Sequence, residues 1–206
     1  MLALFNVESW LESGGLALLG AIVFAESGLL VGFFLPGDSL LFISGFLASS
    51  AGSNVLPPLP LVALVTVLCA IAGDQVGYLF GRRVGPAIFD KPKSRVFNPA
   101  NVTKANVFLE KHGPKTIVLA RFVPVVRTFA PIVAGVGNMK YRTFVAYNVV
   151  GGLVWGAGIT TLGYFLGEVD AVKNNIEIAS VAIVVVSILP VVLEFVKHRR
   201  QANAAE

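Results

Sequence analysis

The stretch ARFVPVVRTFAPIVAG, residues 120–135, places two arginines and two prolines inside an otherwise apolar segment. Arg121 and Arg127 are permanently charged, and a charge at the centre of a membrane helix costs about 2.5–3.5 kcal/mol on insertion scales. Pro124 and Pro131 each remove a backbone donor that a continuous helix needs. We therefore expect a helix broken at both prolines, whose arginines face partners inside the protein rather than lipid.

The whole chain is strongly apolar. Of its 206 residues, 55% are hydrophobic and 14% are charged, with a mean hydropathy of +0.78, whereas soluble domains are about 25% charged. This composition predicts an all-α integral membrane protein with a single membrane domain over residues 1–206. The lone cysteine, Cys69, can form no intrachain disulfide, and we interpret it as a packing residue.

Five apolar stretches follow one another along the chain: Gly14–Ser50, Leu59–Gly81, Thr116–Gly137, Thr143–Gly167 and Ile176–Val196. A helix that crosses a bilayer needs about 20 apolar residues, so the second, fourth and fifth stretches predict about three full transmembrane helices. The first stretch is interrupted at FFLPGDS (33–39), where Pro36, Gly37 and Asp38 are expected to end a helix. The two interrupted stretches are predicted to be re-entrant hairpins, because broken backbone at membrane depth needs protein or a wet cavity around it.

The two halves of the chain also resemble each other. FLPGDSLLFISGFLA (34–48) aligns with FVPVVRTFAPIVAG (122–135) on Phe-x-Pro, and GYLFG (77–81) aligns with GYFLG (163–167) at nearly the same offset. We interpret the pattern as an inverted repeat with two facing hairpins, which is typical of secondary transporters. The expected segments are repeat 1 (14–85), a cytoplasmic amphipathic connector (86–115), repeat 2 (116–167), a C-terminal transmembrane helix (176–196) and a cytoplasmic tail (197–206).

Basic residues predict the orientation in the membrane. They gather in the connector, in KHRR (197–200), and at Lys140 and Arg142, and cytoplasmic segments carry such an excess of Lys and Arg. The N-terminus is then outside and the C-terminus is cytoplasmic, with the first hairpin entering from outside and the second from inside. The same rule explains the net charge of +4 without nucleic acid as a partner.

Five ionisable side chains fall inside the apolar stretches: Glu26, Asp38, Asp74, Arg121 and Arg127. Unpaired, they would cost about 13–18 kcal/mol together on insertion scales, so we expect the acidic break of the first hairpin to lie beside the basic break of the second. Their formal charge of −1 could be cancelled by a proton on Glu26 or Asp38, since a carboxylate in a low-dielectric site can take one up. The arginines could then bind a phosphate headgroup, which suits their forked guanidinium.

These residues also have purely structural interpretations. The charges could be salt bridges that lock the hairpins together without a ligand, and Asp74 could cap or tether a helix instead of coupling to protons. Tyr78 and Tyr164, each in a Gly-Tyr pair, are secondary site candidates that would equally suit an interface. The glycines that recur every four residues are interpreted as close helix packing.

The motifs resemble the DedA family, also called the SNARE-associated or VTT-domain family. The matching residues are Glu26, FLPGD (34–38), GDQVGYLFG (73–81), RFVPVVRTFAPIVAG (121–135), NMKYRTF (138–144) and Trp155. The resemblance implies two facing re-entrant hairpins and residence in the bacterial inner membrane. It also implies lipid translocation linked to proton-motive force, either of undecaprenyl phosphate or of phospholipids, with scrambling in eukaryotic relatives. The family's important acids correspond to Glu26 and Asp38, and its important arginines to Arg121 and Arg127.

The sequence thus predicts a proton-coupled flippase for a lipid that carries a phosphate headgroup. A small-ion or proton antiporter is the alternative, because it could use the same buried charges. A lipid phosphatase is disfavoured, since His112 and His198 both lie in polar flanking segments, and no catalytic, metal or cofactor motif is recognisable. We therefore expect no enzymatic activity, metal or cofactor. In a purely structural protein, such as a membrane assembly factor, the charges would only form salt bridges that hold the two hairpins together. The sequence leaves homo-oligomerisation open.

Overall fold

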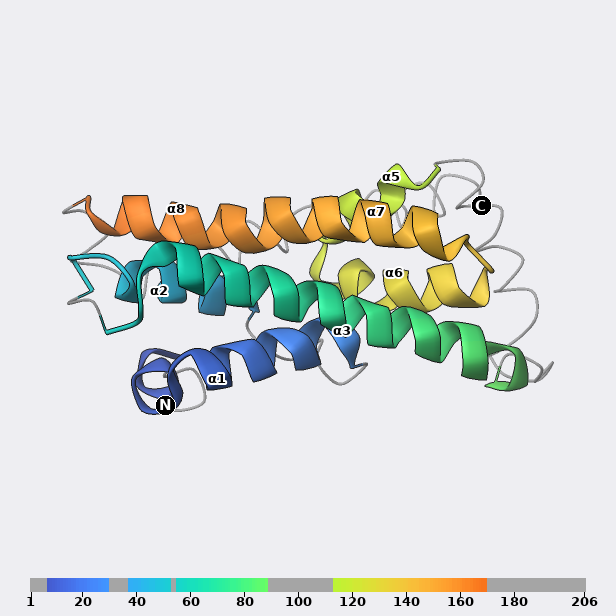
Figure 1. Ribbon diagram of the computed structural model, residues 1–206, viewed down its shortest axis with the longest axis horizontal. Coiled ribbons are helices and arrows are strands. Elements are labelled where there is room, and N and C mark those ends of the chain that lie inside the picture. Colours follow the sequence, from blue (N-terminus) through green and yellow to red (C-terminus); the bar gives the residue numbers. More distant parts are fainter. Residues whose placement is uncertain (1–6, 30–36, 53–54, 89–112, 170–206) are drawn as a thin grey trace, which may run out of the picture.

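The computed structural model describes residues 7–29, 37–52, 55–88 and 113–169, and every regular element in these ranges is helical. Two long helices form the frame (Figure 1). One is α3, Leu59–Ile88. The other is continuous through α7 (Tyr141–Gly152), the π-helical turn η3 (Leu153–Ala157) and α8 (Gly158–Gly167), and it runs antiparallel to α3. By length and apolar composition, Leu59–Gly85 and Tyr141–Gly167 could each cross a membrane.

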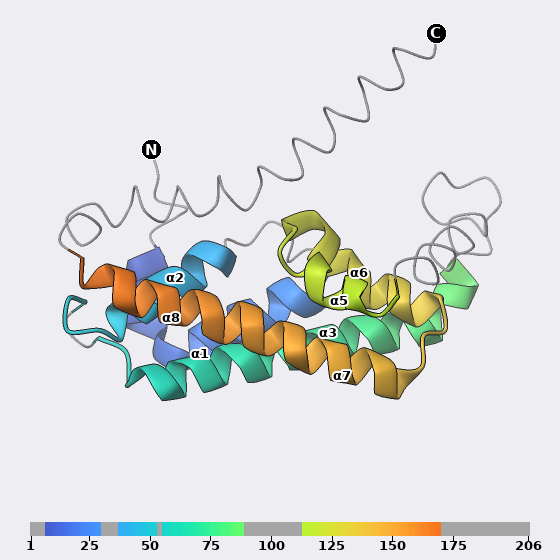
Figure 2. The ribbon, with the colours of Figure 1, turned by 90° about the horizontal axis from the view of Figure 1, so that it is seen from above.

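Shorter helices occupy the two halves of this frame. At the left end of Figure 1, α1 (Val7–Gly28) runs toward the middle of the molecule, and α2 (Gly37–Leu47) lies in the same half. The opposite half holds α5 (Lys115–Ala120) and α6 (Pro124–Val136), and Figure 2 shows the same separation from above. The helix α1 bends at Gly15, whose φ of 53° is in the left-handed region that favours glycine.

Close backbone contacts hold each half to a long helix. The helix α2 packs on α8, where a Cβ at Gly45 would overlap the carbonyl of Thr160 and a Cβ at Gly163 would overlap that of Phe42. The helix α6 packs on α3 in the same manner, with the carbonyl of Ile132 against Gly81. Such contacts are typical of membrane helices, which approach most closely at small residues.

The first interruption differs from its prediction. The helix α1 ends at Gly28, and Gly37 and Asp38 begin α2 instead of ending a helix. The physical reason is that an acidic side chain in the first turn of a helix interacts favourably with the helix dipole. Pro36 itself lies outside the described residues.

The predicted helix break in the second interrupted stretch is confirmed at Pro124 and wrong at Pro131. The chain turns at residues 121–123, and Pro124 then takes the first position of α6, where its missing N–H costs nothing. Pro131 lies inside α6 without ending it. It only leaves the carbonyl of Arg127, four residues earlier, without its helical donor, and packed neighbours make this tolerable in a membrane helix.

Two helix ends also lie beyond their predicted positions. The α3 helix continues past Gly81 through the exposed Arg82 and Arg83, which form helices well and can extend into water from a membrane end. The α1 helix begins at Val7, before the predicted Gly14. Residues 89–112 of the predicted connector, the predicted C-terminal helix (176–196) and the tail lie outside the described residues.

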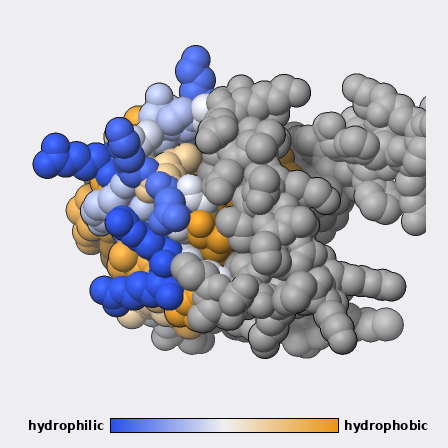
Figure 3. All heavy atoms as spheres, turned by 90° about the vertical axis from the view of Figure 1, so that its right-hand side faces the viewer, coloured by the Kyte–Doolittle hydropathy of each residue, from blue (hydrophilic) through white to orange (hydrophobic). Residues whose placement is uncertain are grey.

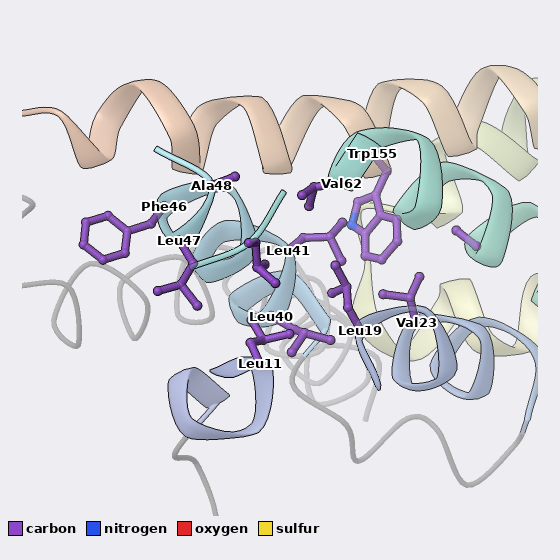
Figure 4. Close-up of a cluster of buried hydrophobic side chains, with 12 residues drawn as sticks. Leu11, Leu19, Val23, Leu40, Leu41, Phe46, Leu47, Ala48, Val62 and Trp155 are labelled. Atoms are coloured by element: carbon purple, nitrogen blue, oxygen red, sulfur yellow. The ribbon is translucent and has the colours of Figure 1, made fainter. Parts of the chain in front are cut away.

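A buried apolar cluster fills the space between α1, α2 and the long helices (Figure 4). It includes Leu19, Leu41, Val62 and Trp155, all at most 1% exposed. Large apolar side chains also cover the outside of the long helices, namely Leu61, Leu64, Leu68, Leu79, Phe80, Val150, Leu153, Val154, Leu162 and Phe165. An apolar exterior of this kind is consistent with an integral membrane protein.

The end of the molecule on the right of Figure 1 exposes basic side chains. Hydrophilic side chains gather on this end in Figure 3, and Arg82, Arg83, Lys140 and Arg142 are exposed at the end of α3 and the start of α7. The charged end therefore contrasts with the apolar outer faces of the two long helices.

Candidate functional site

Two acids from the first half bind a single arginine from the second half. Glu26 lies near the end of α1, Asp38 is the second residue of α2, and Arg127 is the fourth residue of α6. The Arg127 guanidinium donates from Nη1 to Asp38 Oδ1 at 2.6 Å and from Nη2 to Glu26 Oε1. All three side chains are less than 10% exposed. We call this set the Arg127 triad.

A neighbouring set ties the turn between α5 and α6 to both long helices. Arg121 Nη2 donates to Asp74 Oδ2 and to Asn148 Oδ1, each at 2.5 Å. Asp74 lies in the middle of α3 and Asn148 lies in α7, where its amide also donates to the carbonyl of Ile71 at 3.2 Å. We call Arg121, Asp74 and Asn148 the Arg121 set, and its ionic pair is neutral overall.

Trp155, in the π-helical turn, lies between the two sets. Its indole N–H donates to Asp38 Oδ1 at 2.9 Å. The guanidinium carbon of Arg127 lies 4.9 Å from the centre of its ring, and that of Arg121 lies 5.9 Å away. Both separations are within the range of a cation–π interaction, which is strongest with Trp.

Glycines leave the room that these side chains need. A Cβ at Gly37 would overlap the carboxylate of Glu26, and a Cβ at Gly151 would lie 2.9 Å from Arg121 Cδ. Both positions are buried. A larger residue at either position would therefore push a charged side chain away from its partner.

The charges of the site do not balance. The Arg127 triad has two carboxylates for one guanidinium, so its formal charge is −1, while Asp74 and Arg121 cancel. Several buried polar atoms have no hydrogen-bond partner among the described residues: Glu26 Oε2, Gln75 Oε1, Arg121 Nε, Arg127 Nε and Thr128 Oγ1. A buried polar atom left unpaired costs about 1–3 kcal/mol, so the site has chemical capacity for a proton on the acidic side and for an anion on the basic side.

The five charged residues singled out from the sequence thus lie in two adjacent sets, and the two secondary candidates lie elsewhere. The Tyr78 hydroxyl donates to the carbonyl of Met139 at 2.5 Å, and its ring stacks on Phe144 with centres 4.5 Å apart. Tyr164 packs against the apolar cluster, edge-on to Phe165. Both tyrosines therefore fit the interface interpretation better than a role beside the charges.

Two polar residues of the site had no assigned role from sequence. Asn148 is a lone amide in an apolar stretch, and no spacing rule connects it to Arg121. In the sequence, Trp155 was singled out only as one of the residues that resemble the DedA family. It was given no role in the site, since a tryptophan in a membrane stretch usually indicates an interfacial anchor. Its burial at 1% exposure is visible only in the fold.

Comparison with known proteins identifies the family of the chain. The family model described as VTT domain matches residues 35–165. The chain is 48% identical over 189 residues to Protein DedA of Escherichia coli (strain K12), covering 92% of this chain and 85% of that protein. It is also 48% identical over 186 residues to an uncharacterized membrane protein of Mycobacterium leprae, covering 90% of this chain and 82% of that protein. No solved structure matches the chain. The chain therefore belongs to the DedA family of VTT-domain membrane proteins.

Proposed function

We propose that this chain is a proton-coupled transporter that moves a phosphate-bearing lipid, undecaprenyl phosphate or a phospholipid, across the bacterial inner membrane. The observation that carries the proposal is the Arg127 triad, in which one buried guanidinium serves two carboxylates from the opposite half of the chain. The forked guanidinium that binds these carboxylates matches phosphate oxygens equally well. A phosphate headgroup and the two acids would therefore compete for the same donors.

A proton would decide this competition. Asp38 Oδ1 already accepts from Arg127 and Trp155, whereas Glu26 Oε2 has no partner among the described residues. Glu26 is therefore the better place for an incoming proton in this proposal. With Glu26 neutral, the formal charge of the triad changes from −1 to zero, and Arg127 Nη2 becomes available to donate to the headgroup.

The proposed membrane arrangement follows from the two halves. We propose that α1–α2 and α5–α6 are re-entrant hairpins that enter from opposite sides and form an inverted repeat. The support is that each pair occupies one half of the frame, with α2 packed on α8 and α6 packed on α3. The charged sets lie beside the middle of α3, at Asp74, which would be the bilayer midplane if α3 spans the membrane. The basic end that carries Lys140 would then face the cytoplasm and the N-terminus would be outside.

Transport in proteoliposomes tests the proposal. The purified protein is reconstituted with a fluorescent lipid phosphate, and its movement between leaflets is followed with and without a pH gradient. We expect transport that responds to the gradient in the wild type, and a large loss of this response in Glu26→Gln and Asp38→Asn. Gly158→Ala is the matched control, because a Cβ at Gly158 meets nothing within 4 Å.

Three results would contradict the proposal or part of it. Unchanged transport in both acid variants would refute the proton switch. Movement of small ions without movement of lipid would favour the antiporter. Stable protein that moves neither would indicate that the charges only lock the halves together.

A further inference from the structure

Trp155 occupies an unusual position in the long helix α7–η3–α8. Its neighbours Leu153 and Val154 are about half exposed on the apolar outside, at 50% and 53%, whereas Trp155 is 1% exposed. The five-residue π-turn Leu153–Ala157 contains all three residues. Such turns widen a helix locally and are frequent at functional sites, and this one is the segment from which the large indole reaches the charges of the two hairpins.

The indole makes two contacts of different chemical kinds. Its N–H donates to Asp38 Oδ1, the same oxygen that accepts from Arg127. Its ring face lies 4.9 Å from the Arg127 guanidinium. The ring contact needs only the permanent charge of the arginine, so it persists whether the carboxylates are ionised or protonated.

These contacts suggest how the site keeps its shape while its ionic pairs change. If a proton or a headgroup weakens the pairing of Arg127 with Glu26, the bond to Asp38 alone would leave the guanidinium less well fixed unless another group also held it. Arg127 contacts Glu26 from α1, Asp38 from α2 and Trp155 from η3, and of these three only Trp155 has no charge to lose.

We propose that Trp155 is a positioning residue of this site, which holds Asp38 on its indole N–H and Arg127 on its ring face while Glu26 takes up a proton and an anionic headgroup binds. This inference rests on the proposed function for the identity of the ligand, but the positioning itself can be measured without transport.

Tryptophan fluorescence tests the positioning directly, because the chain contains only two tryptophans, Trp10 and Trp155. In the Trp10→Phe variant, all indole emission comes from Trp155. We expect a step in this emission as the pH is lowered, absent after Glu26→Gln, and a change of the emission on adding dodecyl phosphate. The Trp155→Phe variant, in which Trp10 is the reporter, is the matched control and should show neither response. Emission from Trp155 that is unaffected by pH, by Arg127→Lys and by dodecyl phosphate would overturn the proposal.

Transport provides the second readout. Trp155→Phe keeps an aromatic face but loses the N–H, and we expect it to slow lipid-phosphate transport about tenfold, as for a lost hydrogen bond to a charged group. Trp155→Leu loses both contacts and should slow transport further, to about a hundredfold. Equal transport by folded wild type and Trp155→Leu would overturn the proposal. If the wild type moves no lipid phosphate at all, the proposed function fails, while the fluorescence titration still decides whether Trp155 positions the charges.

Discussion

At the scale of single residues, the ratio of acids to arginines governs the behaviour of the site. Arg127 carries one positive charge for the two carboxylates of Glu26 and Asp38, and all three side chains are buried. Removing one partner from a buried ionic set leaves an uncompensated charge, whereas replacing the whole set with neutral groups does not. This difference separates what the charges contribute to stability from what they contribute to function.

The first prediction uses this difference. Arg127→Ala leaves two buried acids without their cation, and we expect it to destabilise the protein by about 3–5 kcal/mol. The triple variant Glu26→Gln, Asp38→Asn, Arg127→Gln removes all the charges and should recover most of that stability without recovering transport. Thermal unfolding in detergent, measured beside proteoliposome transport, provides both quantities. A triple variant that transports normally would contradict a functional role for the triad.

The sequence predicted that the acidic break of the first half lies beside the basic break of the second, but not which acid pairs with which arginine. Buried charges need partners, and the alignment of the two Phe-x-Pro segments placed Asp38 and Arg127 at corresponding breaks. The pairing of Arg121 with Asp74 and Asn148 depends on how two long helices cross, which no local spacing encodes. The prediction that Pro36, Gly37 and Asp38 end a helix was wrong, because a Pro-Gly-Asp run suits the beginning of a helix as well as its end, and Gly37 and Asp38 begin α2.

At the scale of elements, glycines let the short helices contact the long ones through their backbones. Gly163 faces the carbonyl of Phe42 between α8 and α2, and Gly135 faces the carbonyl of Tyr78 between α6 and α3. The helices of both pairs therefore lie so close together at these positions that no side chain fits between them. The sequence indicated close packing from the four-residue spacing of glycines, but not which helices would meet.

The second prediction concerns these contacts. Gly163→Ala and Gly135→Ala each insert a methyl group where backbone atoms already touch, and we expect each to destabilise the protein by about 1–3 kcal/mol. Gly158→Ala, in the same long helix but facing open space, should change stability little. Unfolding temperatures of the three purified variants check the difference. Equal temperatures for all three would mean that the short helices are not packed on the long ones as described.

At the scale of the whole molecule, the proposed topology places the two ends of the frame on opposite sides of the membrane. Ser50 is exposed after α2 at one end. Lys115, the first residue of α5, and Lys140, just before α7, are exposed at the other. If α5–α6 is re-entrant, both lysines face the cytoplasm. A hairpin that crossed the membrane completely would place them on different sides.

The third prediction is read out by thiol labelling. In a Cys69→Ser background, a membrane-impermeant thiol reagent added to intact bacterial cells should label Ser50→Cys. It should label Lys115→Cys and Lys140→Cys only after the inner membrane is permeabilised. Labelling of one lysine position but not the other in intact cells would contradict a re-entrant second hairpin, and labelling of both would contradict the orientation.

Proton uptake on ligand binding is the most direct test of the exchange at Arg127. A phosphate group that takes the place of Glu26 leaves a buried carboxylate without its cation, which should then bind a proton. Calorimetric titration with dodecyl phosphate, repeated in buffers of different ionisation enthalpy, measures this uptake, and dodecyl maltoside is the uncharged control ligand. We expect uptake of a proton with each dodecyl phosphate bound by the wild type and none in Glu26→Gln. Binding without proton uptake by the wild type, or the same uptake by Glu26→Gln, would contradict a carboxylate–phosphate exchange at this site.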